Sequence, residues 1–299
     1  MNMRETGGAS ASALRYHYDV SNDFYALWLG PSMAYSCAQY EDMSADLSAD
    51  ILESAQRRKL RTIVGQAAVK QDDRVLDIGC GWGTLISSLV HEHGAAQAVG
   101  LTMSNAQIDW HATRESDPRV SVLLQDWRDH EPEQKYDAIV SVEALEHFVR
   151  PGLEATERHR IYRDLFERCH AWLEPGGSMC FQFAAYGNSG PQDLDPFISQ
   201  QIFPETDIAR IAEIALAIER LFEIRLLVNE RYQYVRTLRA WLRGLKHHRV
   251  QAVDLVGEAT VSRYERYLQL CTYIFASGSC DLHRITFRRI DHLAGRANR

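Results

Sequence analysis

A short turn in the first third of the chain carries three glycines beside an acidic residue. It reads Asp77-Ile78-Gly79-Cys80-Gly81-Trp82-Gly83. Its first two residues end an apolar run at 74–78, and a helical stretch at 84–93 follows it. Glycine at every second position lets the backbone turn tightly and approach a ligand closely. A dinucleotide fingerprint spaces its glycines differently around a diphosphate, and this turn has no positive residue. The turn therefore predicts a ligand with a cationic amino-acid end, whose ammonium Asp77 holds through water or backbone groups.

Polar residues also follow the next two apolar runs. Residues 102–107, Thr-Met-Ser-Asn-Ala-Gln, follow the run at 97–101 and can meet ribose hydroxyls. After the run at 120–124, the Asp126 carboxylate can accept an adenine amine, and the Trp127 indole can stack on the ring. Each feature alone is equally consistent with a tight turn, a loop cap or a core tryptophan. Three of them in register with three successive strands predict that the ligand is S-adenosylmethionine.

Two glutamates follow a fourth apolar run, at 138–142. Glu143 and Glu146 are three residues apart, on one face of the expected turn. A carboxylate at the end of a buried strand is costly unless it is paired or functional. One alternative is that one glutamate caps the next helix while His147 satisfies the other. Our hypothesis is that Glu146 is the base or holds the base, and that Glu143 steers the substrate or the sulfonium.

The elements that must position these residues alternate between strand and helix. A mostly parallel sheet, covered on both faces, is predicted by this order. The expected strands are 74–78, 97–101, 120–124, 137–142 and 178–183, with helices at 84–93, 104–115 and 157–173. The runs 222–228 and 283–289, which flank helices at about 236–246 and 258–276, can supply two more strands.

The remaining segments are expected to form a helical cap. Residues 19–29 carry aromatics at helical spacing, 49–64 are amphipathic with a Gln-Arg-Arg-Lys polar face, and 193–220 are expected to be an inserted helical segment. No convincing linker is present. We therefore expect a flexible tail at 1–13 and a single domain at 14–299, with cap segments at about 14–70 and 185–280.

Composition and charge narrow the function further. The 299 residues contain 33 Lys and Arg against 40 Asp and Glu, a net charge of −7. This balance argues against a broad nucleic-acid surface and gives no polybasic signal for anionic lipid. The six cysteines form no zinc-like cluster, so we expect no metal and reduced thiols in the cytoplasm. No secretory signal or membrane-spanning segment is recognised, and we therefore expect a soluble protein.

The glycine turn and the polar strand ends resemble class I methyltransferases, and further motifs resemble the cyclopropane-fatty-acid synthase family, which includes the mycolic acid cyclopropane synthases. The narrower similarity is carried by His17-Tyr18-Asp19-Val20-Ser21-Asn22-Asp23-Phe24-Tyr25, Tyr35-Ser36-Cys37-Ala38, Leu101-Thr102-Met103-Ser104, Glu143-Ala144-Leu145-Glu146-His147-Phe148, Ile202-Phe203-Pro204, Tyr234 with Thr237-Leu238, and 264–275. The resemblance implies an α/β fold with a Rossmann-like, seven-stranded, mostly parallel sheet and a helical cap. It implies cofactor contacts at Tyr35, Ser36, Asp77, Gly79, Cys80, Gly81, Trp82, Gly83, Thr102, Met103, Gln107, Asp126, Trp127, Arg128 and Val142.

The resemblance also implies a chemistry: methyl transfer to an alkene carbon, then proton loss from the resulting cation to close a cyclopropane. The family holds a bicarbonate ion as base. Matched one by one, its contacts are the Cys37 backbone amide, Glu146, Gln182 and Tyr234, and Gln182 stands where the family has a histidine. A glutamine can bind an anion but carries no charge. Either bicarbonate is held more weakly, or Glu146 removes the proton directly. Tyr234 alternatively packs beside Trp241.

The substrate is less defined. Aromatic residues gather before the glycine turn, and we expect Tyr18 and Tyr25 to contact the substrate; the alternative is that they form the core stripe of a cap helix. The segments 150–160 and 205–208 depart from the family pattern. The leading hypothesis is an enzyme that methylates carbon of an unsaturated lipid or specialised metabolite, with or without ring closure. A small-molecule N-methyltransferase, as in the plant alkaloid enzymes that resemble the same family, and a non-catalytic cofactor-binding protein are the alternatives.

Overall fold

A central seven-stranded sheet organises the molecule. The computed structural model describes residues 7–10, 12–14 and 20–291. The strand order is β3-β2-β1-β4-β5-β7-β6, with β1 to β5 parallel to one another and β7 antiparallel to both of its neighbours. The strands are β1 (Arg74–Ile78), β2 (Gln97–Thr102), β3 (Val120–Leu124), β4 (Tyr136–Val142), β5 (Leu173–Tyr186), β6 (Phe222–Asn229) and β7 (Cys280–Arg289). The predicted class I methyltransferase sheet is confirmed.

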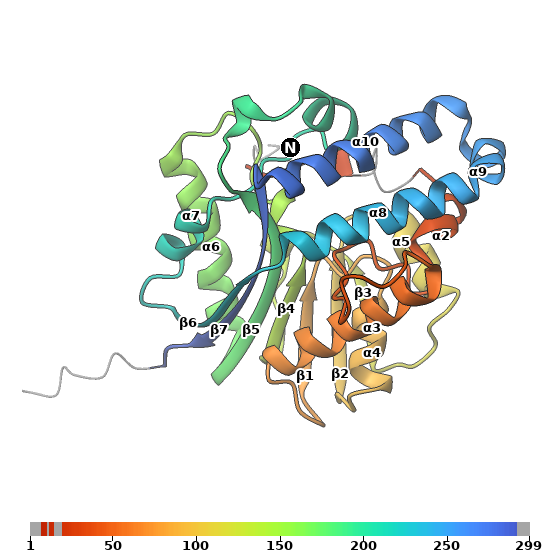
Figure 1. The fold of residues 1–299 in the computed structure, drawn as a ribbon. Helices are drawn as coiled ribbons and strands as arrows, with labels where there is room; N and C mark the ends of the chain where they lie inside the picture. The colour runs from red at the N-terminus through yellow and green to blue at the C-terminus, as the bar shows by residue number, and fades with distance from the viewer. Residues whose placement is uncertain (1–6, 11, 15–19, 292–299) are drawn as a thin grey trace, which may run out of the picture.

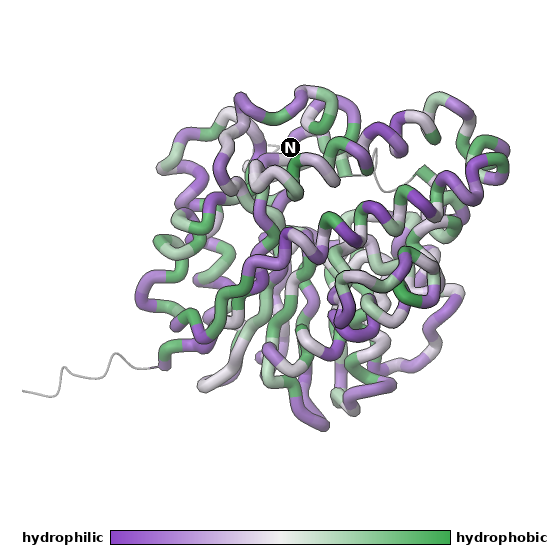
Figure 2. The backbone as a smooth tube through the Cα atoms, viewed as in Figure 1, coloured by the Kyte–Doolittle hydropathy of each residue, from purple (hydrophilic) through white to green (hydrophobic). Residues whose placement is uncertain are grey.

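The central strands are buried on both faces because helices cover them (Figure 1). On one face, α3 (Ala49–Gln66) and α4 (Thr84–His91) share a core with β1 and β2. On the other face, α6 (Ala155–Trp172) and α7 (Ile211–Ala217) pack against β4, β5 and β7. This double cover explains why β1 and β4 read as continuous apolar runs. Figure 2 shows the apolar residues along these strands.

A separate aromatic core lies in the cap, above the first half of the sheet. It joins α2 (Asn22–Leu29), α8 (Arg231–His247), α9 (Arg249–Val256) and α10 (Glu258–Ser277). Trp28 packs edge-on against Trp241, with ring centroids 5.8 Å apart. Figure 1 shows α8 and α10 crossing the molecule side by side. The cap therefore brings the first and last parts of the chain together over the strand ends.

The segment expected to be an inserted helix is mostly irregular. It holds short turns at Pro191–Asp193 and Ile198–Ile202, and then α7, which packs on α6 rather than on the cap helices. Residues 1–6 and 11 lie outside the described ranges, so the division into a tail and one capped domain stays a prediction. Within the described ranges, no helix combines the length and the apolar character needed to cross a membrane.

Candidate active site

The glycine turn between β1 and α4 shapes one wall of a cavity. Gly79, Gly81 and Gly83 have φ of +85°, +56° and +87°, a backbone conformation that disfavours side chains. A Cβ atom on Gly79 would lie 2.3 Å from the Cβ of Ala144, whereas one on Gly81 would meet nothing within 4 Å. The turn is therefore tightly packed behind Gly79 and open in front of Gly81. The open side is the one that a ligand can approach.

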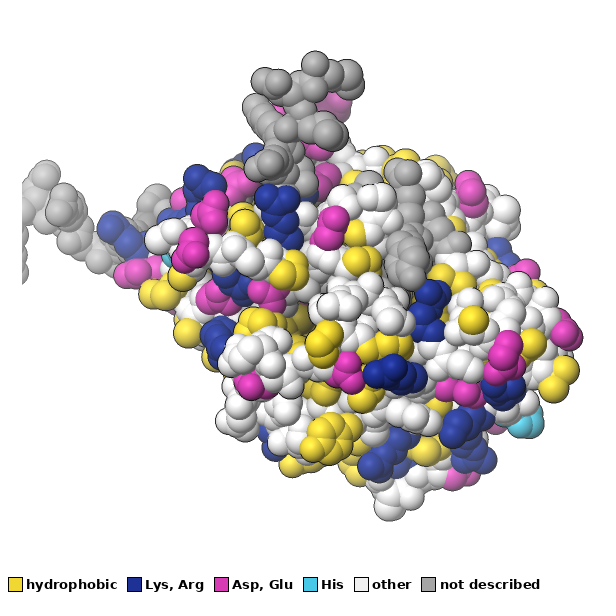
Figure 3. All heavy atoms as spheres, turned by 90° about the horizontal axis from the view of Figure 1, so that it is seen from above, with side chains coloured by type: hydrophobic (Ala, Val, Ile, Leu, Met, Phe, Trp, Pro, Cys, Tyr) yellow, Lys and Arg dark blue, Asp and Glu magenta, His cyan; other side chains and the backbone are white. Residues whose placement is uncertain are grey.

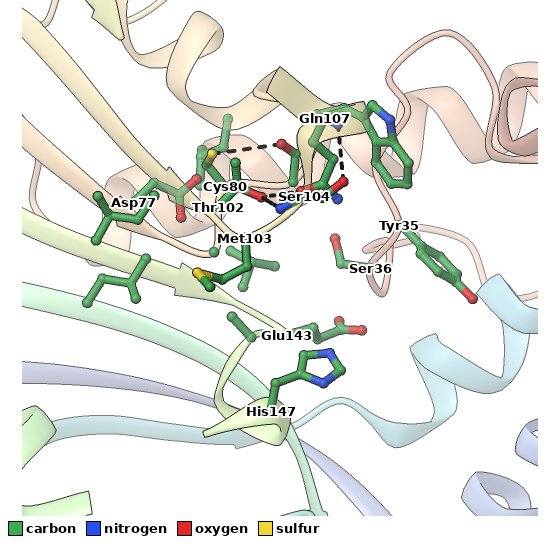
Figure 4. Close-up of a pocket in the computed structure, with 18 of the residues that line it drawn as sticks. Tyr35, Ser36, Asp77, Cys80, Thr102, Met103, Ser104, Gln107, Glu143 and His147 are labelled. Atoms are coloured by element: carbon green, nitrogen blue, oxygen red, sulfur yellow. Dashed lines mark hydrogen bonds between the residues drawn. The ribbon is translucent and has the colours of Figure 1, made fainter. Parts of the chain in front are cut away.

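The predicted cofactor residues converge on this cavity. All fifteen except Gly83 line it, as does Ser104 from the predicted stretch 102–107. Met33, Lys59, Gln125, His147 and Phe148 also line it, and the sequence analysis did not assign them to the cofactor. Gly83 faces the His111 ring instead. Figure 4 shows labelled residues from the ends of β1, β2 and β4, and from the segment before α3, around one space. The polar residues that follow successive strands in the sequence therefore line a single pocket.

The end of β2 and the start of α5 (Asn105–Ala112) are fixed by hydrogen bonds before any ligand binds. Thr102 Oγ1 donates to Gln107 Oε1 at 2.5 Å, and Ser104 caps the helix by accepting from the Gln107 backbone N–H at 3.2 Å. At the end of β3, Arg128 forms an ion pair with Asp126, with Nη2 2.5 Å from Oδ2. This wall is preorganised, which lowers the entropy cost of binding.

Asp77 has the properties of a cation-binding group. Its side chain is 2% exposed, and Oδ1 has no hydrogen-bond partner among the described residues. Burial raises the pKa of Asp77 to about 7, an effect that the ammonium of Lys59 opposes. A buried carboxylate oxygen without a donor is costly, so a cationic ligand group in this cavity would be stabilising. The residues present fit the amino-acid end of S-adenosylmethionine.

The polar face expected on α3 is only partly exposed. Gln56 and Lys59 are buried, with the Gln56 amide donating to the carbonyls of Ala34 and Ser36. Lys59 Nζ donates to Ser36 Oγ at 2.9 Å on the cavity wall. The signal was in the sequence: apolar residues at 52, 55, 60 and 63 put positions 56 and 59 on the same helical stripe. The Gln-Arg-Arg-Lys stretch is therefore not a single exposed polar face.

A second cavity, of about 450 Å³, adjoins the first. Tyr35, Glu143 and His147 line both. Glu146 and Asp207 are the other carboxylates in its wall. The rest of the wall is mainly apolar or aromatic and consists of Pro151, Ala184, Tyr186, Pro191, Leu194, Ile198, Ser199, Phe203, Thr206, Ile208, Tyr234, Tyr267, Cys271, Ile274, Phe275 and Cys280. The Asp207 carboxylate is paired with Arg158 and accepts from the Tyr186 hydroxyl at 2.7 Å. A substrate in this cavity would therefore meet aromatic faces and two glutamates.

Glu143 lies at the junction of the two cavities and is held from three sides. Its Oε1 accepts from the Cys37 backbone N–H at 2.8 Å and from Gln182 Nε2 at 2.8 Å, and its carboxylate is also hydrogen-bonded to Tyr234. Burial raises the pKa of Glu143, and these three donors oppose the shift. The donors that the family resemblance assigns to a bicarbonate ion are engaged by this carboxylate.

The backbone of Glu143 is also unusual. It has φ of +54°, and its N–H donates to the Gln182 carbonyl at 2.6 Å. A left-handed conformation in a residue other than glycine costs free energy and persists where the surroundings enforce it, often at functional sites. Here it directs the side chain from the end of β4 toward Cys37, Gln182 and Tyr234. The strain and the burial both point to a functional carboxylate.

Glu146 has a contrasting environment. Its Oε1 accepts from the Ala184 backbone N–H at 2.5 Å, and Oε2 is buried with no partner in the described part of the chain. Burial, and then the nearby charge of Glu143, raise the pKa of Glu146 to about 8. At neutral pH Glu146 is therefore mainly a neutral acid. When two carboxyls are shifted by different environments, the difference indicates different roles.

This contrast gives a stability prediction. Between its ordinary pKa and about 8, the folded protein binds a proton at Glu146 that the unfolded chain does not bind, so stability falls as pH rises through this window. A Glu146→Gln variant lacks this loss. We expect it to be more stable than the wild type by about 4 kcal/mol at pH 8 and nearly equal to it near pH 4.5. Thermal melts across pH would measure this, with exposed Glu219→Gln as the control; a constant difference would contradict it.

The predicted substrate contact at Tyr25 is not found in the structure. Tyr18 lies outside the described residues. Tyr25 is fully buried in the cap, with its hydroxyl 2.7 Å from that of Tyr264, and it lines neither cavity. Its ring instead packs against Tyr35, which lines both. His147 hydrogen-bonds Thr206 through Nδ1 at 2.9 Å, and burial lowers the pKa of His147 to about 4, so it is neutral.

Cys37 contributes its backbone and not a nucleophile. Burial, and then Glu143, raise the pKa of the Cys37 thiol well above its usual range, which suppresses the thiolate.

The described residues contain no group of three or more His, Cys, Asp or Glu side chains that could hold a metal ion. Figure 3 shows acidic and basic side chains interspersed with hydrophobic ones on the face seen from above.

Sequence comparisons identify relatives over most of the chain. Residues 7–285 match the family described as mycolic acid cyclopropane synthetase. The chain is 31% identical to hydroxymycolate synthase MmaA4 of Mycobacterium tuberculosis, over 92% of this chain and 91% of that protein. It is also 31% identical to a protein named probable fatty acid methyltransferase of Pseudomonas putida, over 92% of this chain and 68% of that protein.

Structure comparisons agree. The cyclopropane synthase MmaA2 from Mycobacterium tuberculosis superposes with a TM-score of 0.83 and 28% identity, covering 94% of this chain and 99% of that chain. Mycolic acid cyclopropane synthase CmaA1, complexed with SAH and CTAB, superposes with a TM-score of 0.83 and 27% identity, covering 94% of this chain and 99% of that chain. Coclaurine N-methyltransferase, at 18% identity and a TM-score of 0.77 over 96% of this chain and 84% of that chain, shares the fold.

Proposed function

The chain belongs to the mycolic acid cyclopropane synthetase family and is an S-adenosylmethionine-dependent methyltransferase, and from this premise we propose that it methylates a double-bond carbon of an unsaturated lipid chain. The observation that carries the proposal is the junction of the two cavities at Tyr35, Glu143 and His147. One cavity suits a cationic amino-acid ligand, and the other is walled mainly by apolar side chains. The two are joined by a buried carboxylate.

The cofactor would be held by the residues that line the first cavity. Asp77 would face the ammonium, the open side of Gly81 would admit the ligand, and the polar groups at the ends of β2 and β3 would contact the nucleoside. When bound, S-adenosylmethionine supplies an electrophilic methyl group. The protein's part is to orient this group toward the second cavity, because positioning accounts for much of the rate of such a transfer.

The second cavity suits a reaction that passes through a carbocation. An alkene is a weak nucleophile, and its methylation leaves a positive charge on the neighbouring carbon. The faces of Tyr35, Phe203, Tyr234 and Phe275 would stabilise this charge, and the apolar wall would exclude the water that would capture it. The proposal therefore assigns the aromatic wall an electrostatic role as well as a packing role.

We propose that Glu143 is the base, in place of a bicarbonate ion. The alkene electron pair would form the new C–C bond as the methyl–sulfur bond of the cofactor breaks and leaves a neutral thioether, and Glu143 would accept the proton that the cation must lose. Loss of this proton from the added methyl group closes a cyclopropane, whereas loss from an adjacent chain carbon leaves a methylated alkene. Glu143 supports this assignment because its three hydrogen-bond donors favour the ionised form. Glu146, with its raised pKa, would instead donate a hydrogen bond.

The test is to locate the transferred methyl group. The protein would be incubated with methyl-labelled cofactor and a lipid extract that contains both unsaturated acyl chains and amino headgroups, and the products hydrolysed and separated. We expect the label on carbon in the acyl fraction, and no label when the acyl chains are saturated. Label confined to nitrogen would contradict the proposal.

A small amine is the second candidate substrate. The favouring observation is that three carboxylates, Glu143, Glu146 and Asp207, line one cavity. The pairing of Asp207 with Arg158 and Tyr186 and the raised pKa of Glu146 reduce the negative charge available to an ammonium. The carbon-labelled product is therefore the better supported outcome.

A further inference from the structure

Lys59 is a buried ammonium that the fold leaves mostly unsatisfied. Its side chain is 2% exposed, and it lines the cofactor cavity. Its one recorded hydrogen bond is to Ser36 Oγ at 2.9 Å, and within the described part of the chain no carboxylate lies within ion-pairing distance. An ammonium has three donors, so two remain available. The charges of Glu143 and Asp77 stabilise this ammonium only in part, because burial still lowers the pKa of Lys59.

Asp77 has the complementary deficiency in the same cavity. Its Oδ1 is buried and has no hydrogen-bond partner among the described residues. The Ser36 hydroxyl accepts from Lys59, which leaves its own hydrogen free to donate into the cavity. Figure 4 shows Ser36 and Asp77 on different walls of this space. The cavity thus offers a positive end at Lys59 and Ser36 and a negative end at Asp77.

We infer that Lys59, together with the Ser36 hydroxyl, binds the carboxylate of the cofactor's amino-acid end. This inference rests on the proposed function, because it assumes that S-adenosylmethionine occupies this cavity. An α-amino acid presents an ammonium and a carboxylate on one carbon, and a zwitterion of this kind would satisfy both buried charges at once. Charge-assisted hydrogen bonds in a water-poor site are among the strong ones.

A counterion role toward Glu143 is the competing explanation for Lys59. Burial lowers the pKa of Lys59 to about 8, and the charge of Glu143 opposes this shift, so the two groups do interact. Glu143 already has three hydrogen-bond donors of its own, however, and Lys59 is directed to Ser36. The geometry therefore favours a ligand carboxylate as the missing partner of Lys59.

The experiment compares two ligands that differ by one carboxylate. Calorimetry would measure the affinity of wild type, Lys59→Met, Lys59→Arg and Arg57→Met for S-adenosylmethionine and for its decarboxylated form. For Lys59→Met we expect a loss of about 10- to 100-fold with S-adenosylmethionine and less than about threefold with the decarboxylated form. Lys59→Arg should retain most of the wild-type preference, and Arg57→Met, at an exposed position on the same helix, should match the wild type.

Each other outcome has a defined meaning. Equal losses for both ligands, or no loss for either, would overturn the inference, and binding of the decarboxylated form shows that the variant is folded. Unchanged affinity with a lowered kcat would assign Lys59 to Glu143 and would also overturn it. If the wild type bound neither ligand, the proposed cofactor would fail first, so the two failures are distinguishable.

Discussion

A Glu143→Gln variant should lose about 10²- to 10⁴-fold in kcat while it keeps the wild-type affinity for S-adenosylmethionine. Glutamine preserves the size of the side chain and can still accept hydrogen bonds from Cys37 and Gln182, but it cannot accept a proton. The loss should therefore appear in the chemical step and not in binding. Single-turnover rates with saturating cofactor would measure it, and calorimetry would confirm that the cofactor still binds.

The neighbouring glutamate provides a matched control. Glu146→Gln makes the same change three residues away on the same turn, but it replaces a carboxyl whose raised pKa already keeps it mainly protonated at pH 7. We expect it to lose no more than about tenfold, because an amide can still donate a hydrogen bond. The reverse order of effects, with Glu146→Gln the slower variant, would return the role of base to Glu146. Near-normal turnover in both variants would exclude either glutamate as the base.

The sheet could be predicted from the sequence because its signals are local. Each buried strand is a short apolar run, the runs alternate with helices, and the carboxyl ends of parallel strands must meet at one edge. The predicted cofactor residues accordingly line one cavity. Gly83 is the exception, because it ends the turn and precedes α4, and a Cβ atom on it would lie only 2.6 Å from the His111 ring.

Side-chain partners were harder to predict because they depend on tertiary contacts. Nothing local indicates that Glu143 turns toward Cys37, which is 106 residues away in sequence, or that its hydrogen bonds engage the donors assigned to an anion. Tyr25 has the aromatic character of a substrate contact, but helix α2 turns it into the cap core. Lys59 differs, since the helical period of α3 contained the information.

The assignment of Glu143 leads to a chemical-rescue prediction. In a Glu143→Gly variant the left-handed backbone at this position becomes favourable for the residue, so the fold should be retained. The change leaves the Cys37 N–H, the Gln182 amide and the Tyr234 hydroxyl buried without their acceptor. Three buried donors around the space of a carboxylate form an anion site. We therefore expect the variant to lose activity as Glu143→Gln does. Added bicarbonate or formate should then raise the activity of the variant about 10- to 100-fold.

The controls separate rescue from a general salt effect. Chloride at the same ionic strength should not restore activity, because it cannot accept a proton from the substrate. Glu143→Gln should not respond to bicarbonate either, since the amide side chain still fills the space. The wild type should be indifferent to the removal and return of bicarbonate, because its own carboxylate engages these donors. Stimulation of the wild type by bicarbonate, or a Glu143→Gly variant that binds cofactor but is not rescued, would show that Glu143 does not stand in for the anion.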